Sequence, residues 1–305
     1  MDLANKIIEA QQVLKLAAEM SAYYYDAPLI LCYSGGKDSD VMLDIAKKCL
    51  RVDQFEVLNS HTTVDAPETV YHIREVFKQL EREGIKTTIQ MPVYQGKPTS
   101  MWKLIETKGM PPTRLMRFCC AVLKEASTPN RMAALGVREV ESVSRRGKDS
   151  FVVRAPKKAD AEYRSLQHTY AMFELDKTGK KDAYQCKVIQ ACKLNKDTLV
   201  NPIYKFTDED IWQYIQENNV KVNPLYAQGF KRVGCVGCPL GGPNSMKKEF
   251  ARWPKYRENY VKAFDRMLKS REVKGLENAK DLSDGEAVMR WWLGDNPNQI
   301  TLDDL

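Results

Sequence analysis

The segment Ser34–Ser39 reads Ser-Gly-Gly-Lys-Asp-Ser, a combination of residue types that suits phosphate binding. Glycine lets the backbone approach a ligand closely, and successive N–H groups at the start of a helix form an anion-binding concavity. Lys37 can bring a point charge to a phosphate, whereas Asp38 is expected to hold Mg²⁺ or to structure the loop. The spacing differs from the GxxxxGK[ST] of kinase P-loops. The predicted nucleotide-binding residues of this glycine loop are Ser34, Gly35, Gly36, Lys37, Asp38 and Ser39.

Four of the eight cysteines form two close pairs that are about a hundred residues apart in the sequence. Brought together by folding, they would supply four thiolates, enough for a [4Fe–4S] cluster or a tetrahedral zinc ion. Adjacent cysteines chelate a single zinc poorly, whereas neighbouring sulfurs can bind different irons of a cluster. The spacing therefore favours a cluster over zinc, and buried or free thiols are the third alternative. The predicted metal ligands are Cys119, Cys120, Cys235 and Cys238.

The overall composition is that of a soluble globular protein, with 43% hydrophobic and 29% charged residues in 305. No apolar run approaches the roughly 20 residues that cross a bilayer, so we expect no membrane association. The first twenty residues mix charges among apolar positions, unlike a secretory signal, and we expect a cytoplasmic location. The net charge of +7 indicates an anionic partner, which a phosphate-bearing small molecule or a nucleic acid would satisfy.

Strands and helices alternate through the first half of the chain. Helical periodicity covers residues 2–25, 67–83 and 100–108, and a further helix follows the glycine loop. Short apolar runs at 29–33, 55–58, 85–91 and 133–143 indicate strands. This alternation predicts an α/β fold with a doubly wound, mostly parallel sheet.

The second half is less regular. The lysine-rich stretch of about residues 146–196 is weakly periodic and is interpreted as an insertion or flexible loop. Residues 207–210 have the form of a capping box that opens a helix through residue 218. We predict a nucleotide-binding α/β domain over residues 1–230, including the insertion, and a helical region with a cysteine pair over residues 231–305.

Basic residues are concentrated between Lys231 and Lys274, where twelve Lys/Arg face four acidic residues. Bases interleaved with aromatics can bind single-stranded DNA or RNA through phosphate contact and stacking. The aromatics recur at helical spacing, however, which favours packing on a core. They are Phe250, Trp253, Tyr260 and Phe264. Near the end, Arg290, Trp291 and Trp292 are expected to anchor the chain to its own core.

Taken together, the motifs resemble those of the phosphoadenosine phosphosulfate (PAPS) reductase family, in the family's order. The resemblance covers about Leu29 to Pro239. The matching segments are 34–39, Pro67-Glu68-Thr69, Arg117-Phe118-Cys119-Cys120 with Lys124, Gly136-Val137-Arg138 with Glu141-Ser142 and Arg145, Asn201-Pro202-Ile203, Asp210-Ile211-Trp212, Asn223-Pro224-Leu225-Tyr226 and Gly234–Pro239. The resemblance implies the adenine nucleotide α-hydrolase fold.

The resemblance also implies roles for individual residues. Arg138 and Arg145 would contact anionic groups of the nucleotide, where guanidinium geometry suits phosphate. The four paired cysteines match the cluster ligands of adenylylsulfate reductases and of ATP pyrophosphatases used in DNA phosphorothioation. The reductases carry a nucleophilic cysteine in a C-terminal Glu-Cys-Gly-Leu-His motif, and no cysteine follows Cys238 here. Cys186 or Cys192 would substitute only if the insertion folded over the site.

Three hypotheses follow from these motifs. The first is an ATP pyrophosphatase with Lys37 and Asp38 as catalytic residues and Mg²⁺ as cofactor, which adenylylates an acceptor for sulfur transfer from a donor protein. The second is a sulfonucleotide reductase that releases sulfite with a thioredoxin-like reductant. The third is a non-catalytic nucleic-acid-binding subunit of a modification or defence system that senses ATP.

Overall fold

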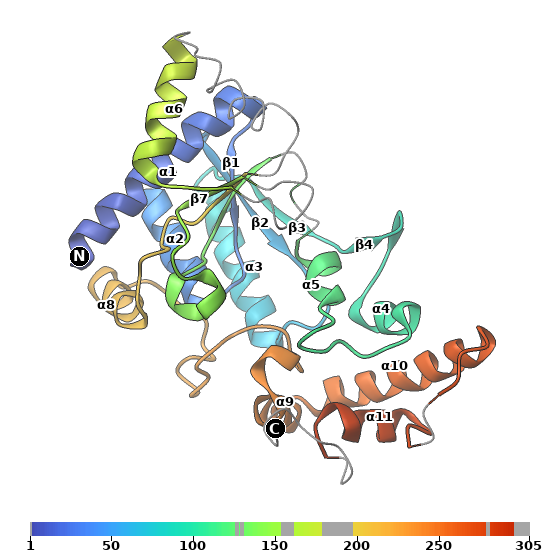
Figure 1. Cartoon of the computed structure of the whole chain (residues 1–305). Coiled ribbons are helices and arrows are strands. Elements are labelled where there is room, and N and C mark those ends of the chain that lie inside the picture. The colour runs from blue at the N-terminus through green and yellow to red at the C-terminus, as the bar shows by residue number, and fades with distance from the viewer. Residues whose placement is uncertain are drawn as a thin grey trace. The chain divides into compact units, whose positions relative to one another are not determined.

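The computed structural model describes residues 2–125, 128, 131–153, 162–178, 198–278 and 281–295 (Figure 1). The chain divides into two compact units that are discontinuous in sequence. The first contains residues 1–59, 68–90 and 127–233, and the second contains 60–67, 91–126 and 234–305. The boundary predicted near residue 230 stays a prediction; the last segment of the second unit begins at Gly234.

Seven strands in the described part of the chain form the sheet of the first unit. β1 pairs in parallel with both β2 and β6, β6 pairs in parallel with β9, and β7 runs antiparallel to β9 and β8. The expected mostly parallel α/β sheet is therefore confirmed. The strand order is β3 (Thr87–Gln90), β2 (Phe55–Ser60), β1 (Leu29–Cys32), β6 (Met132–Leu135), β9 (Thr198–Val200), β7 (Phe151–Val153) and β8 (Glu162–Arg164).

The helices of the first unit begin at recognisable caps. The Asp2 side chain accepts a hydrogen bond from the Asn5 amide, and Thr207 forms the expected capping box with Asp210. Pro67 opens its helix in the first turn, where no N–H is required. The helices are α1 (Leu3–Tyr25), α2 (Lys37–Cys49), α3 (Pro67–Arg82), α6 (Leu166–Thr178) and α8 (Asp208–Asn218).

Both faces of the central strands are apolar, as is usual for parallel strands covered on both sides. Leu29 and Leu31 of β1 belong to the main core, which also contains buried side chains of α1, α2, α3 and α8. Ile30, which points to the opposite face, packs in a smaller cluster with Ala133 and Leu199. This two-sided burial fixes β1 and, with it, the position of the glycine loop at its end.

Two sequence-based expectations were wrong in detail. The strand predicted over 133–143 ends at Leu135, and two 3₁₀ turns follow, η1 (Glu139–Glu141) and η2 (Val143–Arg145). Part of the segment 146–196, interpreted as a loop, forms β7, β8 and α6. Phe151 and Phe173 are buried in the main core. The many lysines near them in the sequence led to the interpretation of this segment as a loop. Residues 154–161 and 179–196 of that segment lie outside the described residues.

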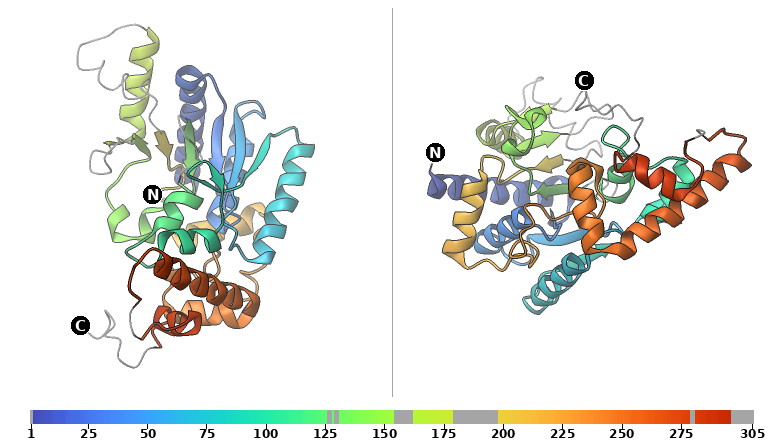
Figure 2. Two further views of the ribbon diagram at one scale, coloured as in Figure 1. Left: turned by 90° about the vertical axis from the view of Figure 1, so that its right-hand side faces the viewer. Right: turned by 90° about the horizontal axis from the view of Figure 1, so that it is seen from below.

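The second unit is mainly helical, around an aromatic core. α10 packs against α4 and α11, which lie beside it in Figure 2. The Tyr260 ring lies 4.8 Å from that of Trp102 and 4.9 Å from that of Trp292. The elements are β4 (Val93–Tyr94), β5 (Lys97–Pro98), α4 (Met101–Lys108), α5 (Phe118–Leu123), η4 (Pro239–Gly241), α9 (Pro243–Arg252), α10 (Pro254–Val273) and α11 (Gly285–Trp292).

This core contains three of the four aromatics named in the C-terminal segment, and the fourth, Trp253, is half-buried. Phe250, Tyr260 and Phe264 are buried in it, so they cannot stack on exposed bases. Trp292 is also buried, and its Nε1 donates to the carbonyl of Pro112 at 2.6 Å, as expected of an intramolecular anchor. Nucleic-acid binding by the basic residues of 231–274 stays a prediction. None of the described helices is both long and apolar enough to span a membrane.

Candidate functional site

The glycine loop lies where β1 ends and α2 begins. β1 is flanked in the sheet by β2 on one side and by β6 on the other. The strands that follow β1 in the sequence first build one half of the sheet, β2 and β3, and later the other half, which begins with β6. In open α/β sheets, ligands bind in the crevice at the carboxyl ends of the strands at such a switch point. The loop is therefore in the position that the sequence predicted.

Two glycines allow the loop to pack closely. Gly35 has φ +71°, and a Cβ on it would lie 2.8 Å from Cγ1 of Ile73. A Cβ on Gly136, just after β6, would lie 3.2 Å from the Asp38 carbonyl carbon. Asn223, fully buried, donates from Nδ2 to the Gly35 carbonyl at 3.1 Å. The loop is thus held from three segments of the first unit.

We predict that Gly35→Ala distorts the loop and lowers nucleotide affinity. The left-handed backbone strain and the contact with Ile73 should together destabilise the protein by about 2–3 kcal/mol. Gly84→Ala is the matched control, because Gly84 also has positive φ (+82°) but nothing lies within 4 Å of its added Cβ. Melting temperatures and ATP titrations of both variants test this. Equal melting and equal binding in the two would contradict it.

Four charged side chains meet above the loop. Arg138 Nε lies 2.7 Å from Asp38 Oδ1, and Arg138 Nη2 donates to Asp208 Oδ1 at 2.9 Å. Lys37 Nζ lies 3.1 Å from the same Asp208 oxygen and 3.4 Å from Asp38. Lys37 and Arg138 are only 6% and 3% exposed. The structure therefore brings the predicted residues Lys37, Asp38 and Arg138 together and adds Asp208.

The guanidinium of Arg138 is incompletely satisfied. Its Nη1 has no hydrogen-bond partner among the described residues, whereas its Nε forms an ion pair with Asp38. Leaving a buried cationic donor unpaired is costly. A guanidinium is best completed by the oxygens of a phosphate or carboxylate. An anionic nucleotide group fits this requirement.

The backbone amides of the loop are already bonded within the protein. The Lys37 amide donates to Tyr226 Oη at 2.9 Å, and the Gly36 amide donates to Ser39 Oγ at 3.2 Å. Ser34 Oγ lies 3.3 Å from Ser39 Oγ. Burial raises the pKa of Tyr226 to about 12, so its hydroxyl keeps its proton at neutral pH. Trp212 of α8 packs edge-on against the Tyr226 ring at 5.5 Å.

A buried polar triad supports the loop from behind, and sequence reasoning missed it. Tyr33 Oη donates to Asp40 Oδ1 at 2.5 Å, and His72 Nε2 lies 3.0 Å from Tyr33 Oη and 3.1 Å from Asp40 Oδ1. All three are at most 4% exposed. Desolvation, followed by the charge of Asp40, raises the pKa of Tyr33 well above its usual range. The triad ties the end of β1 to the first turn of α2 and to α3.

Arg145 lies in η2, where it forms an ion pair with Glu141. Its carbonyl accepts a hydrogen bond from Tyr204 Oη at 2.5 Å. Its predicted contact with an anionic ligand stays a prediction.

The predicted metal ligands all belong to the second unit. Cys119 and Cys120 lie on α5, and Cys235 and Cys238 flank a turn before η4. This turn is fixed because the Val236 amide donates to the Val64 carbonyl at 2.8 Å. All four thiols are half-buried. Cys186 and Cys192 lie outside the described residues.

Electrostatic effects link the four thiols. The hydrogen bond from Cys119, together with that from Arg117 at 3.7 Å, lowers the pKa of Cys120 to about 5. The hydrogen bond with Cys120, then burial and the charges of the other three cysteines, raise the pKa of Cys119. Burial raises the pKa of Cys235, and the neighbouring Lys124 opposes that rise. Thiolate character is therefore concentrated on Cys120, beside the positive charges of Arg117 and Lys124, which favour the thiolate form.

Four cysteine thiols are a donor set that suits a thiolate-ligated metal centre, but their sulfurs do not surround a common point. Among the described residues, no three Cys, His, Asp or Glu side chains converge as metal ligands. The assignment of these four cysteines as metal ligands stays a prediction.

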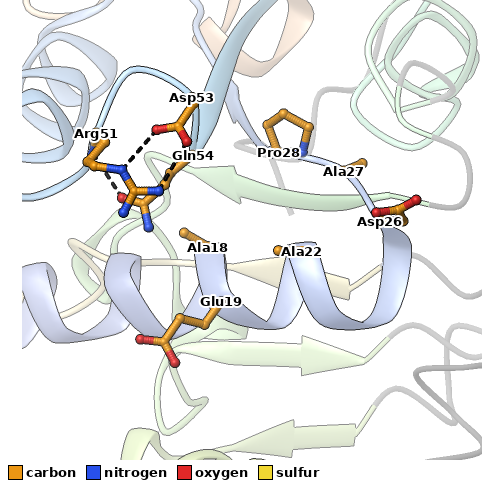
Figure 3. A pocket seen from close by; sticks show the side chains of 9 residues that line it. All are labelled: Ala18, Glu19, Ala22, Asp26, Ala27, Pro28, Arg51, Asp53 and Gln54. Carbon is orange, nitrogen blue, oxygen red and sulfur yellow. Dashed lines mark hydrogen bonds and ion pairs between the residues drawn. The ribbon is translucent and has the colours of Figure 1, made fainter.

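A separate pocket of about 310 Å³ lies at the amino ends of β1 and β2, the edge of the sheet opposite the glycine loop (Figure 3). Its lining includes Arg51 and Asp53, whose side chains pair with each other at 3.0–3.1 Å. This pocket is therefore not part of the glycine-loop site.

A mostly parallel α/β sheet with a glycine loop and two nearly buried cations at its switch point is the arrangement of a PP-loop type of fold. The chain belongs to the family described as the phosphoadenosine phosphosulfate reductase domain, whose model matches residues 28–240.

Individual relatives are distant. An uncharacterized protein of Methanocaldococcus jannaschii is 25% identical over 250 residues, covering 78% of this chain and 42% of its own length. The chain thus spans less than half of that relative. The adenosine 5'-phosphosulfate reductase of Mycobacterium tuberculosis is 37% identical over 54 residues, 18% of this chain and 21% of the reductase.

Two solved structures also resemble the chain. The PAPS reductase of Candida auris in its phosphate complex has a TM-score of 0.41 and 15% identity, covering 72% of this chain and 87% of that one. The U34-tRNA thiolase NcsA of Methanococcus maripaludis, with its [4Fe-4S] cluster, has a TM-score of 0.40 and 11% identity, covering 88% and 82%.

Proposed function

We propose that the protein is an ATP pyrophosphatase that cleaves the bond between the α- and β-phosphates and adenylylates an acceptor for sulfur transfer. The observation that carries the proposal is the buried Arg138, whose Nη1 has no hydrogen-bond partner among the described residues, beside Lys37 and the glycine loop. Negative charge develops on the leaving pyrophosphate, and preorganised donors in a water-poor site stabilise such charge strongly.

Each residue has a defined task in this proposal. Arg138 would contact phosphate oxygens with its fork, and Lys37 would place a point charge on the leaving group. Asp38 would hold Mg²⁺, because this ion usually takes one or two carboxylates and completes its shell with phosphates and water. Bound Mg²⁺ would supply further neutralisation of phosphate charge.

Product analysis with ATP tests the activity. In the absence of the acceptor, water would take its place, giving one AMP and one pyrophosphate per ATP. Sulfite release from PAPS or adenylylsulfate with a thioredoxin-like reductant, without pyrophosphate from ATP, would instead establish the reductase activity that the family's description suggests. Salt-sensitive DNA or RNA binding without nucleotide turnover would support the non-catalytic subunit.

The four paired cysteines would hold the [4Fe–4S] cluster, with zinc as the alternative. We expect about four irons and matching sulfide per chain after anaerobic purification. Cys119→Ser or Cys235→Ser should lose most of this iron, because each removes a thiolate ligand. Cys49→Ser is the control, since Cys49 is equally half-buried but lies on α2 in the first unit. One zinc per chain, or iron unaffected by both substitutions, would refute this assignment.

A further inference from the structure

The phosphate-binding donors of the loop are occupied by the protein's own acceptors. One oxygen of Asp208 lies 3.1 Å from Lys37 Nζ and 2.9 Å from Arg138 Nη2. Tyr226 Oη accepts the Lys37 amide at 2.9 Å. The two cations that a nucleotide phosphate needs are thus shared with a carboxylate of the same chain.

Asp208 is well placed to be displaced. It is the first residue of α8, its side chain is 62% exposed, and its two partners are nearly buried. An exposed carboxylate can turn into solvent at little cost, whereas Lys37 and Arg138 are fixed by their surroundings. Although burial raises the pKa of Asp208, the Lys37 hydrogen bond and the Arg138 charge lower it overall. The carboxylate is therefore ionised at neutral pH and competes as an anion.

The following inference rests on the proposed nucleotide site. We propose that Asp208 is a built-in competitor that occupies the phosphate position and sets the affinity of the loop for anionic ligands. A ligand must bring enough negative charge to displace a carboxylate from two cations at once. A pyrophosphate or triphosphate chain does so more readily than a singly charged group. Asp208 therefore weakens the binding of every anionic ligand. Ligands of low charge retain the least affinity, so the site favours polyphosphates.

The test is the affinity of Asp208→Asn for inorganic pyrophosphate and for ATP, measured by calorimetry in EDTA so that no metal bridges the ligand. The amide keeps the size of the side chain and removes its charge. We expect about fivefold tighter binding at low salt, the range of an exposed ion pair, and a smaller gain at high salt. A melting curve and the second variant Asp208→Ala guard against a folding defect.

Glu209→Gln is the matched control. Glu209 is the next residue on α8, is exposed, and bonds to Thr207. The Glu209→Gln substitution removes one negative charge from the same helix turn without removing a contact to Lys37 or Arg138. Its affinity should stay within about twofold of wild type, because the screened charge of an exposed residue has little effect at a distance.

The outcomes separate this inference from the proposed function. If wild-type binding is lost in Lys37→Ala but both Asp208 variants bind pyrophosphate no better than wild type, the competitor role is overturned while the nucleotide site stands. Weaker MgATP binding in Asp208→Asn would likewise overturn it and assign Asp208 to metal binding. If neither wild type nor Asp208→Asn binds pyrophosphate or ATP, both proposals fail.

Discussion

Lys37→Ala is expected to reduce pyrophosphate release from ATP by about 10²–10³-fold, the usual effect of removing one preorganised donor from a developing charge. Lys37 Nζ is nearly buried and lies within 3.4 Å of both Asp38 and Asp208. Its loss therefore removes the point charge on the leaving group and also leaves two carboxylates with Arg138 as their remaining cation in this cluster. Rates of pyrophosphate formation at saturating ATP measure the effect.

The control for this variant is Lys47→Ala on the same helix. Lys47 pairs with Glu83 at 2.7 Å in the last turn of α2, away from the loop. This partly exposed pair lies away from the loop and contributes little stability, so the variant should release pyrophosphate at the wild-type rate. Pyrophosphate release by Lys37→Ala at the same rate as Lys47→Ala would remove Lys37 from catalysis.

Arg138→Gln is expected to weaken ATP binding by roughly 10- to 100-fold, because charge-assisted hydrogen bonds contribute about 1.5–3 kcal/mol. Its Nη1, which has no hydrogen-bond partner among the described residues, is the donor that a phosphate would complete. Arg138→Lys keeps the charge but loses the planar fork, so it should recover only part of the affinity. Equilibrium dialysis with labelled ATP distinguishes the three proteins.

Arg51→Gln is the matched control for Arg138. Arg51 pairs with Asp53 at the opposite edge of the sheet, in the pocket of Figure 3, and its substitution also removes one positive charge. Unchanged ATP affinity is expected. If Arg51→Gln and Arg138→Gln weakened binding equally, the effect would come from net charge and not from the site.

The local part of the site could be predicted from the sequence. The strand, the glycine turn and the following helix are encoded by consecutive residues, so Ser34–Ser39 were placed correctly at the end of β1. The capping box at Thr207 was predicted for the same reason. Both cysteine pairs were identified, and the structure places them in one unit.

The long-range part could not be predicted. Asp208 and Tyr226 reach Lys37 from 171 and 189 residues away, and an acidic residue in the first turn of a helix is ordinarily explained by the helix dipole. His72 is buried on α3, and its partners Tyr33 and Asp40 come from other elements, so no local pattern indicates this triad. Within 146–196, the high lysine content indicated an exposed loop, although Phe151 and Phe173 are buried. The composition of a segment does not distinguish its exposed residues from its buried ones.

The central claim is that nucleotide phosphates bind at the glycine loop through Lys37 and Arg138. Its most direct test is a titration of wild type, Lys37→Ala and Arg138→Gln with ATP under identical conditions. The account predicts saturable binding to wild type that is strongly weakened in both variants. Binding of equal affinity in all three proteins, or no binding of ATP to wild type at millimolar concentration, would contradict it.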